Sequence, residues 1–160
     1  AWVESIPAST ADVPPNMPIA PLWRRLAAML YDSIVLIGLW IIVSFLVTAA
    51  FGIDSAGTAE SQLNPLYRYT LLAAMLGSAY LFFGWFWVNS GQTIGMQAWK
   101  LRVQNADGSA ISWRQVGLRY VSAPLAVAAF GFGYWWALFD RQQRSWPDIA
   151  SNSYIVTVPR

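Results

Sequence analysis

Two long apolar runs restrict what this chain can fold into. Residues 26–52 contain one charged side chain, Asp32, and residues 66–89 contain one, Arg68. About 20 consecutive apolar residues are enough to cross the hydrocarbon core of a bilayer as an α-helix. Both runs meet that length. The sequence therefore predicts an all-α integral membrane protein with two transmembrane helices.

The composition supports a membrane location and narrows the possible functions. Only 11% of the residues are charged, whereas about 25% are charged in an average soluble domain. The chain has ten Trp residues, and Trp is enriched at membrane–water boundaries. It has no Cys and no His, which excludes thiolate nucleophiles, zinc fingers and catalytic His–Ser pairs. We expect a non-enzyme without a cofactor or metal, and a net charge of +2 does not indicate nucleic-acid binding.

The flanking residues predict the domain limits and the orientation. Residues 1–21 contain five prolines, so we expect a flexible or extended tail and a membrane domain over residues 22–160. Arg24 and Arg25 stand just before the first apolar run, whereas residues 53–65 carry acidic but no basic side chains. Basic residues favour the cytoplasmic side. We therefore expect a cytoplasmic N-terminus and a multi-pass topology.

A third apolar stretch, residues 120–139, allows two interpretations. It is just long enough for one crossing, but Arg residues flank both of its ends, and Pro124 and two glycines interrupt it. It is either a single span or a broken, re-entrant segment that returns to the same side. Residues 101–104 and 154–158 both resemble strands. We expect them to pair in a small cytoplasmic β-hairpin-like element, which favours the re-entrant form.

The second apolar run contains small residues that suit helix packing. Gly77, Ser78 and Gly84 would let a neighbouring helix approach closely. The many Trp residues are best interpreted as contacts with lipid or partner helices.

Asp32 is the charged residue that most needs explanation. A carboxylate at the centre of a membrane helix costs about 2.5–3.5 kcal/mol. Asp32 could be an ion or proton site, or a structural contact to another helix or to Arg25, which lies two turns away on the same face. We favour the structural contact. We interpret Asp148 as a helix cap or turn residue beside the second strand, rather than as a proton relay.

Four motifs in order resemble the RDD family of bacterial membrane proteins, which is named for one arginine and two aspartates. They are WRRLAAMLYD at residues 23–32; GQTIG at 91–95 with LRV at 101–103 and Asp107-Gly108; SWRQ at 112–115; and WALFDR at 136–141, followed by Asp148. The resemblance covers residues 22–158. It implies a membrane scaffold in which Arg25, Asp32 and Asp148 are the family's motif residues. Pro147 replaces a His that is common in the family, which argues against a proton relay there.

Two functions are compatible with these features. The first is a small accessory or assembly subunit docked on a larger membrane complex. The alternative is an oligomeric transporter or ion/proton exchanger component that uses Asp32; the resemblance implies transport, and sodium/proton exchange is proposed for some family members. We favour the first, because three short apolar segments can hardly enclose a pathway. The expected location is the bacterial inner membrane, and the expected partners are lipid and either other membrane subunits or further copies of this chain.

Overall fold

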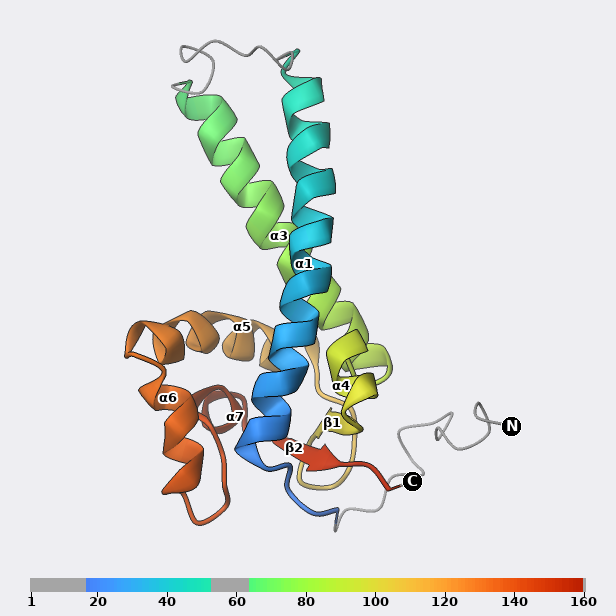
Figure 1. The fold of residues 1–160 in the computed structure, drawn as a ribbon, viewed down its shortest axis with the longest axis vertical. Coiled ribbons are helices and arrows are strands. Elements are labelled where there is room, and N and C mark those ends of the chain that lie inside the picture. Colours follow the sequence, from blue (N-terminus) through green and yellow to red (C-terminus); the bar gives the residue numbers. More distant parts are fainter. Residues whose placement is uncertain (1–16, 53–63, 160) are drawn as a thin grey trace, which may run out of the picture. The chain divides into compact units, whose positions relative to one another are not determined.

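The computed structural model describes residues 17–52 and 64–159. The elements, in chain order, are α1 (Leu22–Ala50), α3 (Pro65–Asn89), α4 (Ile94–Ala98), β1 (Leu101–Gln104), α5 (Trp113–Ala128), α6 (Phe132–Trp135), the 3-10 turn η2 (Trp136–Leu138), α7 (Trp146–Ser151) and β2 (Tyr154–Thr157) (Figure 1). They form two compact units, which in the described chain are residues 17–32 with 83–159, and residues 33–52 with 64–82. We call the first the basal unit and the second the helical unit.

The helical unit consists of residues 33–50 of α1 and residues 65–82 of α3, with the residues that follow α1 and precede α3. The Trp40 Nε1 donates a hydrogen bond of 3.0 Å to the Met75 carbonyl oxygen, and the hydroxyls of Thr48 and Tyr67 lie 3.1 Å apart. These contacts hold the two helices side by side at two levels. Both helices are long and apolar enough to cross a membrane, which confirms the two predicted transmembrane helices.

The first helix begins four residues before the apolar run. The Pro21 carbonyl oxygen accepts hydrogen bonds from the N–H groups of Arg24 and Arg25, so both arginines lie in the first turn of α1. Proline suits this place because its missing N–H would have no partner at a helix start. The side chain of Arg25 is consequently positioned by a regular helix and not by a loop.

The basal unit contains the predicted two-stranded sheet. β1 and β2 pair antiparallel, with Leu101 opposite Thr157 and Gln104 opposite Tyr154. The predicted pairing is confirmed, although helices separate the two strands along the chain, so they are not joined by a hairpin turn.

The end of the proline-rich segment borders the same sheet. Ile19 forms a bridge with Val156, and the Ala20 N–H donates to the Ile155 carbonyl oxygen at 2.9 Å. Most of the expected tail lies outside the described residues. Its described end is extended, as its prolines predict, but it is held in place against β2.

The third apolar stretch is bent and does not form one straight helix. The axes of α5 and of the α6–η2 segment differ by 108°, and the break falls at Phe130 and Gly131, which both have positive φ. The start of α5 is tied to the end of α7, because the Gln115 Nε2 donates to the Ser151 carbonyl oxygen at 2.9 Å. The predicted break is confirmed, and a bend of this kind belongs to a broken span or to a re-entrant segment.

Candidate functional site: a buried arginine–aspartate cluster

The short helix α7 places Asp148 at the centre of the basal unit. Asp148 occupies the third helical position, and its Oδ2 accepts hydrogen bonds from the Ser145 N–H at 3.0 Å and the Ser145 hydroxyl at 2.8 Å. This arrangement is a capping box, which satisfies donors that a helix start leaves free. Asn152 ends the helix in the left-handed conformation, with φ of 49°. The cap role predicted for Asp148 is therefore the geometry observed.

Asp148 also forms two buried ion pairs. Its Oδ2 lies 2.8 Å from the Arg25 Nη1, and its Oδ1 lies 2.7 Å from the Arg119 Nη1. The side chain of Asp148 is 0% exposed, and those of Arg25 and Arg119 are 2% and 5% exposed. Burial alone would raise the pKa of the Asp148 carboxyl, but the charges of Arg119 and Arg25, with the Ser145 hydrogen bonds, hold that pKa below its usual value.

The remaining donors of the two arginines extend the cluster to other elements. Arg25 donates through Nε to the Ala20 carbonyl oxygen and through Nη2 to the Gln143 carbonyl oxygen, both at 2.9 Å. Arg119 donates to the Ser153 hydroxyl at 2.6 Å, and its guanidinium lies 5.2 Å from the centre of the Trp87 ring. The cluster thus links α1, α3, α5 and α7 with the segments around residues 20, 143 and 153.

Asp32 forms a separate buried contact. Its Oδ2 accepts a hydrogen bond from the Thr93 hydroxyl, and its Oδ1 accepts one of 2.8 Å from the Gly95 N–H. Thr93 is the N-cap of α4. A Cβ on Gly95 would lie 2.2 Å from the Ala28 carbonyl oxygen, so only glycine permits α4 to approach α1 this closely. Asp32 and Gly95 together hold the GQTIG segment against the first helix.

Arg25 and Asp32 do not bond to each other, although the sequence suggested this contact. Seven residues correspond to about 10 Å along a helix axis, so these two side chains lie on one face but at different levels. Each is bonded to a different partner: Arg25 to Asp148, and Asp32 to Thr93 and Gly95. The sequence spacing identified the shared face correctly but not the partners.

The three predicted packing residues have different surroundings. A Cβ on Gly84 would lie 2.1 Å from a carbon of the Trp113 ring, so Gly84 is in tight contact with α5. Within the described chain, nothing lies within 4 Å of a Cβ placed on Gly77. The Ser78 hydroxyl donates to the Met75 carbonyl oxygen of its own helix at 2.9 Å.

Sequence reasoning missed the role of Arg119. In the sequence, Arg119 marks only the boundary of the third apolar stretch. The available indication is its position: an arginine beside a long apolar run is costly to bury without an acidic partner, and Asp148 is one of two acidic residues that follow the third apolar stretch, the other being Asp140. Pairing Arg119 with Asp148 in sequence would have predicted the α5–α7 contact.

The arrangement indicates a structural centre. Its buried charges are paired with one another or hydrogen-bonded, and among the residues that the structure describes no group of three or more His, Cys, Asp or Glu side chains could hold a metal ion.

Comparison with known proteins identifies the family. No curated protein and no solved structure is significantly similar to this chain. The family model described as RDD family matches residues 19–152, a range that includes Arg25, Asp32, Arg119 and Asp148. The chain therefore belongs to the RDD family, as its four motifs predicted.

Proposed function

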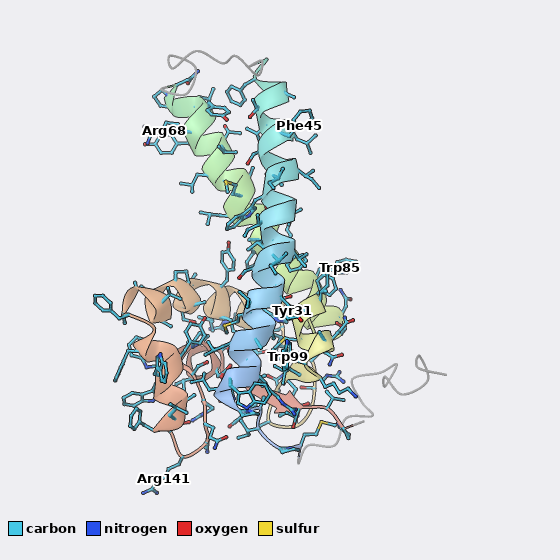
Figure 2. The ribbon with its side chains drawn as sticks, in the orientation of Figure 1. Tyr31, Phe45, Arg68, Trp85, Trp99 and Arg141 are labelled. Atoms are coloured by element: carbon cyan, nitrogen blue, oxygen red, sulfur yellow. The ribbon has the colours of Figure 1, made fainter. Side chains whose placement is uncertain are left out.

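We propose that this protein is a small non-catalytic membrane subunit that docks through its helical unit on a larger membrane complex. The observation that carries the proposal is the exposure of that unit. The most apolar part of α1 has none of its residues buried by the described chain. Ile41 and Phe45 are 66% and 72% exposed, and Phe45 projects outward from the helix (Figure 2). Such faces need lipid or another membrane protein to cover them.

The buried charges support a scaffold role for the basal unit. A carboxylate that carries ions or protons has to exchange partners during transport. Both oxygens of Asp32 already accept hydrogen bonds from α4 and its cap. The alternative function, an oligomeric exchanger that uses Asp32, would have to break these contacts in every cycle, and we therefore rank it second.

The docking face that we propose lies on α3 around Gly77. Ala73 and Gly77 are both exposed and are one turn apart. Small residues spaced in this way let two membrane helices approach closely. Because the position of a Cβ on Gly77 is open in the described chain, a larger side chain there would not disturb this protein's own packing. The occupant would be a transmembrane helix of the partner complex.

We also propose the orientation in the bacterial inner membrane. Arg24, Arg25, Lys100 and Arg114 belong to the basal unit, which would then face the cytoplasm according to the distribution of basic residues. The basal unit would lie at the membrane surface, with the bent α5–α6 segment in contact with lipid.

Purification of the full chain in mild detergent tests the proposal. The protein should co-migrate with a larger membrane complex, and Gly77→Leu should abolish that co-migration without lowering its abundance. The matched control is Gly38→Leu, which adds the same bulk at an equally open position on α1. A homo-oligomer that retains ion exchange in Gly77→Leu and loses it in Asp32→Asn would refute the subunit role and favour the exchanger.

A further inference from the structure

One buried cation of the basal unit has no acidic partner among the residues that the structure describes. Arg102 is 5% exposed, and its Nε has no hydrogen-bond partner. The ion pairs of the described residues join Asp148 to Arg25 and Arg119, and Asp140 to Arg144. Arg102 takes part in none of them, so in this part of the chain its guanidinium has no acidic partner and its Nε has no hydrogen-bond acceptor.

This situation is costly for a guanidinium. Arginine stays protonated in proteins, and a buried charge without a partner is strongly unfavourable. Burial lowers the pKa of Arg102, and no neighbouring charge raises it again. The contrast with Arg25 is direct, since each nitrogen of Arg25 has an acceptor. An anion from outside the described chain would remove the cost at Arg102.

The fold places Arg102 next to the end of the second membrane helix. α3 ends at Asn89, and the Gly91 carbonyl oxygen accepts a 2.7 Å hydrogen bond from the Val103 N–H. A Cβ on Gly91 would lie 3.0 Å from the Arg102 Nε, so the guanidinium stem lies against the backbone that leaves the helix. This level of a membrane protein is where lipid headgroups are found.

Aromatic side chains mark the same level. Trp85, in the last turns of α3, is 65% exposed and projects from the helix (Figure 2). Trp99, three residues before Arg102, packs edge-on against the rings of Trp23 and Tyr31, with ring centres 5.5 and 6.2 Å apart. Trp and Tyr prefer the headgroup region of a bilayer, so their presence supports a phosphate-rich environment around Arg102.

We propose that Arg102 binds a phosphate group, supplied in the membrane by the headgroup of an anionic phospholipid. The guanidinium offers planar, paired donors that match phosphate oxygens. Basic sites beside transmembrane helices on the cytoplasmic side recognise anionic headgroups in this way. This proposal does not depend on the docking role of the helical unit.

The experiment measures the thermal stability of the full-length protein in detergent as lipid is added. The lipids are phosphatidylglycerol, which is anionic, and phosphatidylcholine, which has no net charge; inorganic phosphate is added in a third arm. Phosphatidylglycerol should raise the melting temperature of the wild-type protein much more than phosphatidylcholine does. In Arg102→Met the extra effect should disappear, with apparent binding at least about tenfold weaker, which corresponds to about 1.4 kcal/mol.

Two controls separate this proposal from a purely structural role. Arg114→Met removes an exposed arginine of the same unit and should leave the phosphatidylglycerol effect intact. Without lipid, Arg102→Met should be at least as stable as wild type, because an apolar side chain of similar length replaces an unpaired charge. An Arg102-dependent effect of inorganic phosphate that matches the lipid effect would reassign the site to free phosphate. An equal phosphatidylglycerol effect in wild type and Arg102→Met would overturn the proposal.

Discussion

Replacement of Asp148 by Asn tests the central role of the buried cluster. The amide keeps the size of the side chain and one acceptor oxygen, but it removes the charge that both Arg25 and Arg119 contact at 2.8 and 2.7 Å. Removing one member of a buried ion pair costs about 3–5 kcal/mol. Because the two pairs share one carboxylate, we expect a loss in this range rather than twice as much. The total stability of a domain is about 5–15 kcal/mol, so the loss should be large.

The assay is unfolding of the purified protein in mixed micelles, monitored by circular dichroism, at several pH values. The pKa of Asp148 is lowered in the folded protein, while an unfolded Asp titrates near pH 3.9. The carboxylate therefore contributes its full stabilisation above about pH 4, and this contribution declines as the pH falls through the folded pKa. The difference between wild type and Asp148→Asn should be constant near neutrality and shrink in acid.

A matched variant and a refuting result complete this test. Asp107→Asn makes the same chemical change at an exposed carboxylate that contacts Ser109 and no arginine, so it should lower the unfolding midpoint far less than Asp148→Asn does. If Asp148→Asn unfolds at the wild-type midpoint at neutral pH, the buried cluster does not hold the fold. A difference that persists unchanged at pH 2–3 would show that something other than the charge is responsible.

Three further predictions concern packing, Asp32 and topology. Asp32→Asn should reach normal abundance in the membrane, since its amide oxygen can still accept from the Gly95 N–H and its NH2 group can donate to the Thr93 hydroxyl oxygen. Asp32→Leu should be depleted on immunoblots, because the Thr93 hydroxyl and the Gly95 N–H both lose their acceptor. Gly84→Leu should lower the melting temperature, because a Cβ there already overlaps the ring of Trp113; unchanged melting would contradict the close contact. In intact cells, a cysteine introduced at Asn64 should react with an impermeant thiol reagent and one at Ser109 should not; the reverse pattern would invert the proposed orientation.

The sequence was most informative where a local pattern determines the structure. Apolar length predicted α1 and α3, and the strand-like pattern of residues 101–104 and 154–158 predicted the two strands that pair. These features depend on neighbouring residues, so they can be read along the chain.

The partners of the buried charges could not be read in this way. Arg25 pairs with a residue 123 positions away and Asp32 bonds to residues 61 and 63 positions away. Such contacts depend on how α1, α4 and α7 pack in three dimensions. The local spacing of Arg25 and Asp32 suggested mutual contact, but helix rise places them at different levels.

The long separation between Arg25 and Asp148 has a consequence for biosynthesis. The first helix leaves the ribosome and enters the membrane well before α7 is translated. Arg25 therefore has no Asp148 to pair with during most of synthesis. Residues 18–20 likewise obtain their strand partner only when β2 appears. Translation that stops before Asp148 would therefore leave a chain with unmatched charges and an open sheet edge, features that cellular proteases can recognise. The cluster makes completion of the chain a condition for its stability.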